Sequence, residues 1–265
     1  MLTIAGSDSG GGAGIQADIK TASANGVFAT SVITSLTAQN TSGVDSIHIV
    51  PAEFVRAQAE AVLRDIGADA VKLGMMPTPE IVDVVADLIL KYDLQNVVLD
   101  PVMIATSGDR LIAEDAVERI ISRLLPLVKV ITPNIPEAQF ITHIPMNSAD
   151  PVDYRRTAQA FFDLRANAVL IKSGHREAVE VEDVLYDGSV ERVYRYGYQK
   201  VKTRNTHGTG CTLSSAIAVG LASGLELPEA VAKAEDYIHR AVEAGADYQL
   251  GSGHGPVHHF FDYWK

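Results

Sequence analysis

Residues 205–212, Asn-Thr-His-Gly-Thr-Gly-Cys-Thr, could bind an anion where a helix begins. Gly208 and Gly210 carry no side chain that would block an incoming phosphate. The free N–H groups and the positive dipole end of a helix N-terminus attract negative charge. Cys211 stands at the same end, where the pKa of a thiol is lowered and its thiolate could accept a proton. The alternative is that this cysteine is a small buried hydrophobic residue, but the glycines flanking Thr209 favour chemistry.

A second glycine-rich segment follows the first predicted strand, at residues 6–14 (Gly-Ser-Asp-Ser-Gly-Gly-Gly-Ala-Gly). Its five glycines would let backbone amides approach a ligand closely. It matches neither the P-loop nor the Gly-x-Gly-x-x-Gly pattern. A tight strand-to-helix turn would need fewer glycines, so we expect ligand contact here.

Three charged residues follow other predicted strands. Lys172 closes a buried strand, and because lysine is rarely buried without a partner, we expect it to point at an anion. Asp100 ends a strand in the equivalent place and suits a metal or a phosphate-bound water. Asn134 and Glu137 lie three residues apart at a helix start, so both could reach a hydrated Mg²⁺. The same spacing also fits an ordinary helix N-terminus.

Other candidates favour packing or gating. The histidines at 254, 258 and 259 lack supporting carboxylate or cysteine spacing, so packing is favoured over a metal site. Met75 and Met76 follow a strand and could fill the core or form an apolar wall over a planar ring. Residues 106–110 (Thr-Ser-Gly-Asp-Arg) are the candidate lid, because they are small and polar and follow Asp100.

Short apolar runs alternate with segments of helical period along the whole chain. The predicted strands cover residues 2–5, 32–36, 70–73, 96–100, 128–132 and 168–172. The predicted helices cover residues 53–66, 79–92, 113–125, 151–164, 212–223 and 228–248. In the first helix we expect Phe54, Ala57, Ala61, Val62 and Ile66 to form the buried stripe. Thr78 is the expected N-cap of the second helix, and Gly224 is placed to end the helix at 212–223.

This alternation predicts an α/β fold: a doubly wound, mainly parallel central sheet with helices on both faces. Residues 182–196 read as a small edge hairpin with its turn at Asp187-Gly188. No repeat, linker or composition break divides the chain, so we expect one domain over residues 1–265.

Composition excludes several classes of function. The 265 residues carry a formal net charge of −11, which argues against a nucleic-acid partner but not against a small anionic substrate. A single cysteine excludes a disulfide framework and a four-thiolate zinc site. No apolar run approaches the length of a membrane span, and no signal-peptide pattern is found. The chain therefore reads as a soluble, cytoplasmic enzyme or ligand binder.

Several segments taken together resemble one enzyme family. They are 6–8, 11–18, 38–41, 132–137, 207–211 and 255–259. In this order they resemble the hydroxymethylpyrimidine/phosphomethylpyrimidine kinases of thiamine biosynthesis, in the ribokinase-like superfamily. The resemblance covers essentially the whole chain. It implies a homodimer that uses ATP and Mg²⁺ to phosphorylate 4-amino-5-hydroxymethyl-2-methylpyrimidine, first to the monophosphate and then to the diphosphate.

The resemblance also implies roles for individual residues. Gln39 would bind the aminopyrimidine edge, Met75 and Val102 would line the ring, and Asp18 with the Gly6 and Ala13 backbone would lie near the hydroxymethyl group. Cys211 would be the base, in an anion hole formed with Gly208, Thr209 and Gly210. The residues implied at ATP are Asn134, Lys172, Thr206, Gly208, Thr209 and Gly210. Asp100 and Glu137 would serve Mg²⁺.

The nearest alternative is a pyridoxal or pyridoxine kinase, or an enzyme acting on both substrates, because relatives with the same Gly-Thr-Gly-Cys segment phosphorylate pyridoxal. Two alternatives belong to other functional classes: a pyrimidine-binding protein without catalytic activity and a scaffold that binds partners at the edge of its sheet. Asn134, Glu137, Lys172 and the glycine segment favour the kinase.

Overall fold

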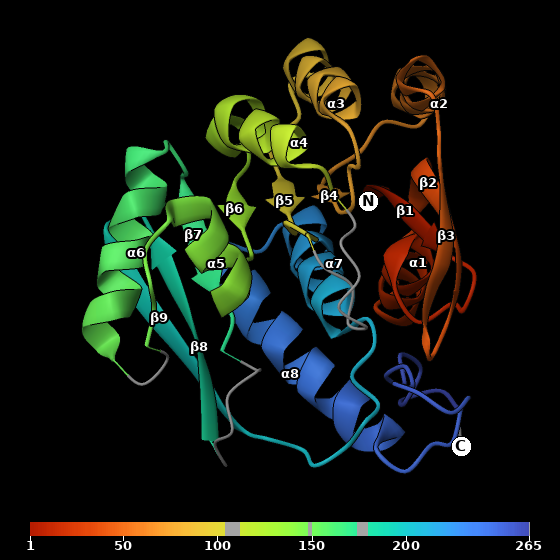
Figure 1. Cartoon of the computed structure of the whole chain (residues 1–265), viewed down its shortest axis with the longest axis vertical. Coiled ribbons are helices and arrows are strands. Elements are labelled where there is room, and N and C mark those ends of the chain that lie inside the picture. Colours follow the sequence, from red (N-terminus) through yellow and green to blue (C-terminus); the bar gives the residue numbers. More distant parts are fainter. Residues whose placement is uncertain (104–111, 148–149, 174–179, 265) are drawn as a thin grey trace.

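The computed structural model describes residues 1–103, 112–147, 150–173 and 180–264, so the candidate lid at 106–110 lies outside the described residues. The strands are β1 (Leu2–Asp8), β2 (Thr30–Asn40), β3 (Gly43–Ile49), β4 (Val71–Leu73), β5 (Val97–Leu99), β6 (Val130–Ile131), β7 (Ala168–Ile171), β8 (Glu180–Asp187) and β9 (Arg192–Gln199). The α-helices are α1 (Gly14–Ala24), α2 (Ala52–Asp65), α3 (Pro79–Lys91), α4 (Glu114–Arg119), α5 (Ile135–Thr142), α6 (Pro151–Asp163), α7 (Thr209–Ala222) and α8 (Leu227–Gly245). Figure 1 shows the strands enclosed by these helices.

The strands form one sheet in the order β3-β2-β1-β4-β5-β6-β7-β8-β9. The pairs from β2 through β1 and β4 to β7 are parallel, whereas β3, β8 and β9 pair antiparallel. The predicted doubly wound, mainly parallel sheet and its hairpin after β7 are confirmed. A second hairpin, β2–β3, was not predicted and forms the opposite edge of the sheet.

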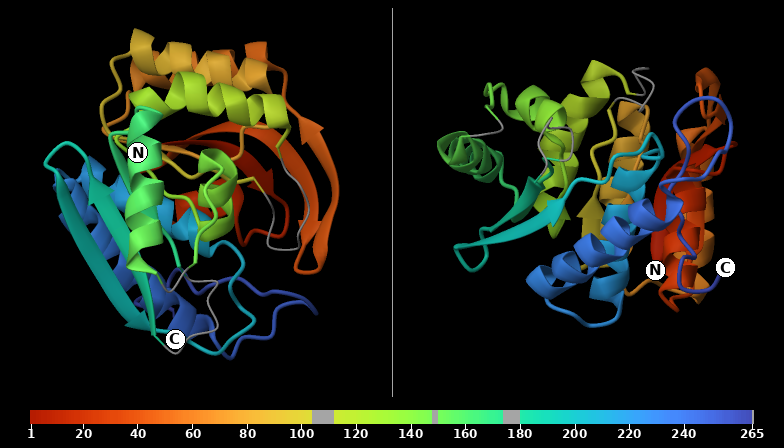
Figure 2. Two further views of the ribbon diagram at one scale, coloured as in Figure 1. Left: turned by 60° about the vertical axis from the view of Figure 1, so that its left-hand side comes forward. Right: turned by 90° about the horizontal axis from the view of Figure 1, so that it is seen from below.

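Alternate residues of the central strands bury into two separate cores. In β5, Val97 and Leu99 face the core under α2–α6, whereas Val98 faces the core under α1, α7 and α8. β7 alternates in the same way, with Leu170 on the α7 side. Figure 2 shows the two helix layers on opposite sides of the strands. This burial on both faces is why the short strands read as continuous apolar runs.

The prediction for α2 was right about the helix and wrong about its buried face. Val55 and Ala59 are fully buried, and Leu63 is nearly so. By contrast, Phe54 is 59% exposed and Ile66 is 58% exposed. Two apolar stripes of similar period run along this helix, and the sequence alone does not say which one meets the sheet.

Three element boundaries differ from prediction where backbone geometry decides them. β1 continues past Gly6 to Asp8 through a bulge beside β2, so Gly6 lies within the strand and not in a loop. α1, which was not predicted, starts at Gly14. α7 begins at Thr209, three residues earlier than expected, because Gly208 caps it with a left-handed φ of 81°. After α4 the chain continues as a π-helical turn (Ile120–Leu124) and a 3₁₀ turn (Leu125–Leu127).

Two predicted helix ends are confirmed. The Thr78 hydroxyl accepts a hydrogen bond from the Ile81 N–H at 3.4 Å at the start of α3. Gly224, with φ of 83°, follows the last turn of α7. In the described part of the chain, no helix combines the length and apolar character needed to cross a bilayer.

Candidate active site

Two helix N-termini meet at the carboxyl edge of the parallel strands. α1 and α7 have no capping side chain and no acidic residue in their first turns. The two helices are joined by a hydrogen bond of 2.7 Å from the Ser215 hydroxyl of α7 to the Asp18 carboxylate of α1. The N–H groups of Gly210 and Cys211 donate to no acceptor among the described residues. Unsatisfied helix-terminal amides of this kind form a site for an anion.

Thr206 and Thr209 shape the entry to α7. The Thr206 carbonyl accepts hydrogen bonds from the Thr209 N–H at 3.3 Å and from the Thr209 hydroxyl at 3.1 Å. The hydroxyl of Thr209 therefore stabilises the turn in the ligand-free chain, and both residues remain partly exposed.

The glycine segment does not offer its amides to a ligand, contrary to prediction. The Asp8 carboxylate accepts hydrogen bonds from the N–H groups of Gly10 at 2.7 Å, Gly12 at 3.0 Å and Ala13 at 2.9 Å. The Gly11 N–H donates to the Asp8 carbonyl. The segment is a turn closed around Asp8, and the Ala13 N–H is not free to bind substrate.

The glycines are still required, because the segment packs against the start of α7. A Cβ on Gly208 would lie 1.8 Å from the Gly12 carbonyl oxygen. A Cβ on Gly12 would lie 2.4 Å from Cδ2 of His207. The two glycine segments are therefore in direct backbone contact.

Lys172 and Asp100 form a buried ion pair beneath the first turn of α7. The Lys172 Nζ lies 3.0 Å from Asp100 Oδ1, and a Cβ on Gly210 would lie 3.4 Å from that Nζ. Burial alone would lower the pKa of Lys172, but Asp100 and Glu137 raise it above its usual value. Burial would raise the pKa of Asp100, but Lys172 and Lys72 hold it below its usual range. Both groups are charged at neutral pH, with the lysine directly under the free amides.

Asn134 and Glu137 form a capping box at the start of α5. The Asn134 side chain accepts a hydrogen bond from the Glu137 N–H at 2.9 Å, and Glu137 accepts one from the Asn134 N–H at 2.8 Å. The ordinary helix N-terminus that the spacing allowed is therefore present. Burial, reinforced by Asp100, raises the pKa of Glu137 to about 7.

The donor set suits a metal ion carried by a phosphate group. In the described ranges, no three His, Cys, Asp or Glu side chains could hold a metal by themselves. However, the Asp100 and Glu137 carboxyl groups share one nearby cation, Lys172. The raised pKa of Glu137 comes first from burial and second from the nearby Asp100 carboxylate. Mg²⁺ is normally bound through one or two carboxylates plus substrate phosphates, and these two residues fit that pattern.

The Asp18 carboxylate is engaged inside the protein, and its expected position near the hydroxymethyl group of the substrate stays a prediction. Its side chain is fully buried and pairs with the equally buried Lys72, with Nζ–Oδ1 of 2.8 Å. Thr3 and Ser215 also donate to the Asp18 carboxylate. Burial would lower the pKa of Lys72, but Asp18 and Cys211 raise it. The pair is a fixed internal charge between α1, β4 and α7.

The Cys211 thiol also differs from the expectation of a lowered pKa. Burial raises its pKa to about 11, although Lys72 and the Gly14 N–H act in the opposite direction. The side chain is only partly covered, so it is reachable. In the ligand-free chain it is a neutral thiol at physiological pH.

The expected substrate side gathers around the ends of β1, β2 and β4. Met75 is buried, its carbonyl accepts a hydrogen bond from the Thr34 hydroxyl at 2.6 Å, and a Cβ on Gly6 would lie 3.3 Å from the Met75 sulfur. Gln39, near the end of β2, lies with its Nε2 3.5 Å from the His207 ring. Val102 is half-buried and follows Asp100.

Two features were not assigned from sequence. His207 Nε2 lies 2.8 Å from Asp8 Oδ2, which links the glycine segments. Lys72 is the other, although the reasoning applied to Lys172, that a buried lysine needs a partner, would have found it.

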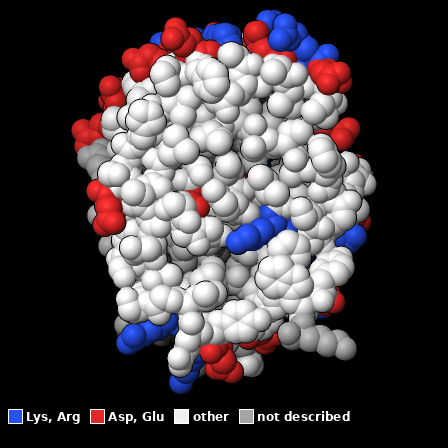
Figure 3. Space-filling view, turned by 90° about the vertical axis from the view of Figure 1, so that its right-hand side faces the viewer, with Lys and Arg blue, Asp and Glu red and all other residues white. Residues whose placement is uncertain are grey.

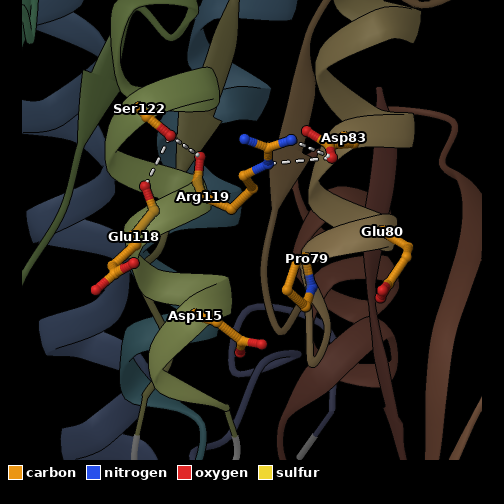
Figure 4. Close-up of a pocket in the computed structure, with 7 residues that line it drawn as sticks. All are labelled: Pro79, Glu80, Asp83, Asp115, Glu118, Arg119 and Ser122. Atoms are coloured by element: carbon orange, nitrogen blue, oxygen red, sulfur yellow. Dashed lines mark hydrogen bonds and ion pairs between the residues drawn. The ribbon is translucent and has the colours of Figure 1, made fainter.

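Two further groups of residues have no assigned part in the chemistry of this site. His258 and His259 are buried, and His259 Nε2 lies 2.9 Å from the Thr212 hydroxyl. A groove between α3 and α4 contains an Arg119–Asp83 ion pair of 3.0 Å (Figure 4). Its lining residues are Pro79, Glu80, Asp83, Asp115, Glu118, Arg119 and Ser122. None of them is a predicted site residue.

Comparisons with known proteins show the family and the fold to which this chain is similar. Residues 8–258 match the family model described as phosphomethylpyrimidine kinase. The chain is 49% identical over 264 residues to a hydroxymethylpyrimidine/phosphomethylpyrimidine kinase of Rhizobium meliloti, covering 100% of this chain and 98% of that protein. It is 47% identical over 259 residues to the thiamine biosynthesis bifunctional protein ThiED of Geobacter sulfurreducens, covering 98% of this chain and 52% of that longer protein. Among solved structures, the ADP complex of Bacillus subtilis pyridoxal kinase has a TM-score of 0.88 at 35% identity, covering 97% of this chain and 96% of that one.

Proposed function

The chain belongs to the phosphomethylpyrimidine kinase family, and on that premise we propose the reaction of this phosphotransferase and the residues that perform it. It transfers the γ-phosphoryl group of ATP to the hydroxyl of 4-amino-5-hydroxymethyl-2-methylpyrimidine, and then a second phosphoryl group to the monophosphate, for thiamine biosynthesis. The observation that carries this proposal is the pair of free amides, Gly210 and Cys211, above the Lys172–Asp100 pair.

Phosphoryl transfer needs alignment and charge neutralisation more than covalent help. The free amides of Gly210 and Cys211 hold the equatorial oxygens of the transferring group, and Lys172 adds a positive charge beneath them. Thr206, Thr209 and Asn134 line the nucleotide side. Mg²⁺ carried by the nucleotide would be held by Asp100 and Glu137 and would neutralise phosphate charge.

Cys211 takes the proton of the substrate hydroxyl. Because its pKa is raised to about 11 in the ligand-free chain, only a small thiolate fraction is available at neutral pH. A positioned base typically contributes about 10²–10⁴-fold, so the amides and Lys172 carry most of the rate enhancement.

The aminopyrimidine lies between the ends of β1, β2 and β4. Gln39 forms hydrogen bonds with the edge of the ring, while Met75 and Val102 pack against the ring as apolar walls. Gly6 lets the Ser35 and Met75 side chains pack against the backbone, since a Cβ there would lie 2.8 Å from the Ser35 hydroxyl and 3.3 Å from the Met75 sulfur. Ala13 contributes through its methyl group and carbonyl, because its N–H is bonded to Asp8.

A second candidate substrate is pyridoxal. The structural likeness to a pyridoxal kinase favours testing it. The higher identity to a pyrimidine kinase favours the aminopyrimidine as the main substrate.

The deciding experiment measures turnover of the aminopyrimidine alcohol, its monophosphate and pyridoxal side by side, with ATP and Mg²⁺ in each. We expect the first two to be phosphorylated with kcat/KM at least about tenfold above pyridoxal. The Gly208→Ala variant, prepared identically, controls for contaminating kinases. Turnover of pyridoxal alone would assign the chain to vitamin B6 metabolism. ATP consumption with none of the three would make it a kinase of another alcohol.

The active protein is a homodimer of single-domain subunits. The face carrying α2, β2 and β3 has few charged side chains away from its rim (Figure 3). Its elements expose large apolar side chains, including Phe54 at 59% and Ile49 at 44%. A patch of this kind marks an interface. Sedimentation of the intact chain tests it: Phe54→Asp should shift the species to a monomer, and a wild-type monomer would contradict it.

A further inference from the structure

Asp8 accepts four hydrogen bonds near the proposed site, and it has no place in the reaction. Its side chain is 3% exposed and accepts three backbone N–H bonds from the glycine segment. A fourth bond, 2.8 Å long, joins it to Nε2 of His207, which is 199 residues away in sequence. Burial would raise the pKa of Asp8, but the bonds from His207, Ala13 and Gly10 hold it below its usual range. The carboxylate is therefore charged, and His207 Nε2 is the donor.

The backbone of His207 is held by the segment at Gly255 and Pro256, and its side chain extends to Asp8. Its N–H donates to the Gly255 carbonyl at 3.0 Å, and it forms a β-bridge with Pro256. The next residue, Gly208, is the N-cap of α7. The Asp8–His207 bond thus joins the turn before α1 to the residue before the α7 cap.

The packing around this bond leaves no room for a change in spacing. The Gly208 Cα faces the Gly12 carbonyl so closely that a methyl group could not fit, and the Gly12 Cα faces the His207 ring in the same way. On the far side of the turn, α1 starts at Gly14, and its Asp18 carboxylate accepts a hydrogen bond from the Ser215 hydroxyl of α7 at 2.7 Å. A shift of the glycine segment would therefore move both helix N-termini relative to each other.

We propose that Asp8 and His207 form a latch that seats the N-terminus of α1 against that of α7 and so positions the free amides of Gly210 and Cys211, and the Cys211 thiol, for phosphoryl transfer. The inference rests on the proposed function. Both are positioning residues, since they act through the glycine segments and through Gly14. Misplacement of about 1 Å is enough to lower kcat by about 10²-fold, so breaking the latch should affect kcat more than nucleotide binding.

Steady-state kinetics of the full chain with the aminopyrimidine alcohol and ATP tests the latch. His207→Phe removes the donor but fills the space, whereas His207→Gln keeps an N–H group near the position of Nε2. We expect His207→Phe and Asp8→Asn to lower kcat by about 30-fold or more, with the KM for ATP changed less than about threefold. His207→Gln should retain at least about a third of kcat.

Asp187→Asn is the matched control. Asp187 is also a buried turn carboxylate, bonded to the Ser189 N–H at 3.0 Å and hydroxyl at 2.6 Å, but it lies beside Ala168 at the opposite end of β7. It should lose thermal stability without losing kcat. Equal kcat losses in all four variants, or a full kcat in His207→Phe, would overturn the proposal.

A second readout does not depend on turnover. Cys211 is the only cysteine, so the pH dependence of its alkylation by iodoacetamide in the ligand-free protein reports the pKa of this thiol alone. The Gly14 N–H lowers the pKa of this thiol, so a shift of the α1 N-terminus away from it should raise the midpoint by about one pH unit in Asp8→Asn and His207→Phe, but not in Asp187→Asn. An unmoved midpoint in both latch variants would refute the latch. Because this titration needs no substrate, it separates failure of the latch from failure of the proposed function.

Discussion

The role of Cys211 gives a quantitative prediction about pH. Its pKa of about 11 means that only about one molecule in a thousand carries a thiolate at pH 8. If that thiolate accepts the substrate proton, kcat/KM should rise about tenfold per pH unit between about pH 8 and 10. The rise reflects the fraction of the base that is ionised in the free enzyme.

Removal of the thiol measures how much Cys211 contributes to kcat. Cys211→Ala and Cys211→Ser should each lower kcat by about 10²–10⁴-fold and leave the KM for ATP nearly unchanged. Both variants should also lose the pH-dependent rise. The activity that remains comes from the helix-terminal amides and Lys172, which neither substitution touches.

The assay couples ADP release to a spectrophotometric readout at saturating Mg²⁺. It starts near pH 8 because the pKa of Glu137, about 7, would otherwise add a second titration. A flat wild-type profile, or an equal slope in Cys211→Ala, would refute the reasoning. Cys211 would then be a packing residue at the helix start.

Three further substitutions test the rest of the site. Lys172→Ala should raise the KM for ATP at least about tenfold and, because it leaves Asp100 unpaired, lower the free energy of urea unfolding by about 3–5 kcal/mol. The double variant Lys172→Ala/Asp100→Asn should regain the free energy of unfolding but not the affinity for ATP. Full recovery of both quantities would contradict the role of Lys172. Glu137→Gln keeps the capping box. Because the folded pKa of Glu137, about 7, exceeds the usual 4.5, the wild type should lose Tm relative to this variant as pH rises from about 4.5 to 7 and level off above that, and parallel Tm curves would refute this. Gly208→Ala should abolish activity and lower the free energy of unfolding more than Gly224→Ala does. Both glycines have a left-handed φ, but only at Gly208 would an added Cβ lie within 4 Å of other backbone atoms. Similar urea midpoints of the two variants would argue against the close contact.

The sequence predicted most of the fold because burial on both sheet faces leaves a clear signal. Strands such as Val97–Leu99 are short and apolar, and α3 carries an apolar stripe with a proper N-cap. The β2–β3 hairpin escaped prediction because β3 is an edge strand with polar and exposed residues. Edge strands of this kind lack the apolar run on which the prediction relied.

The site was predicted in its parts but not in its electrostatics. Gly208, Gly210, Lys172 and Asp100 come together because each follows a strand or caps a helix at one sheet edge. The pairing of Asp18 with Lys72 depends on which side chains face the α7 layer, and the pKa of Cys211 depends on burial. Both the pairing and the pKa depend on residues that are far apart in the sequence.

The most direct test of the account is a crystal structure with ADP, aluminium fluoride and the aminopyrimidine alcohol. The account predicts fluoride ligands of the planar group within about 3 Å of the Gly210 and Cys211 nitrogens, with the alcohol oxygen in line behind it. Binding of that group at residues 10–13, or anywhere away from the start of α7, would contradict it.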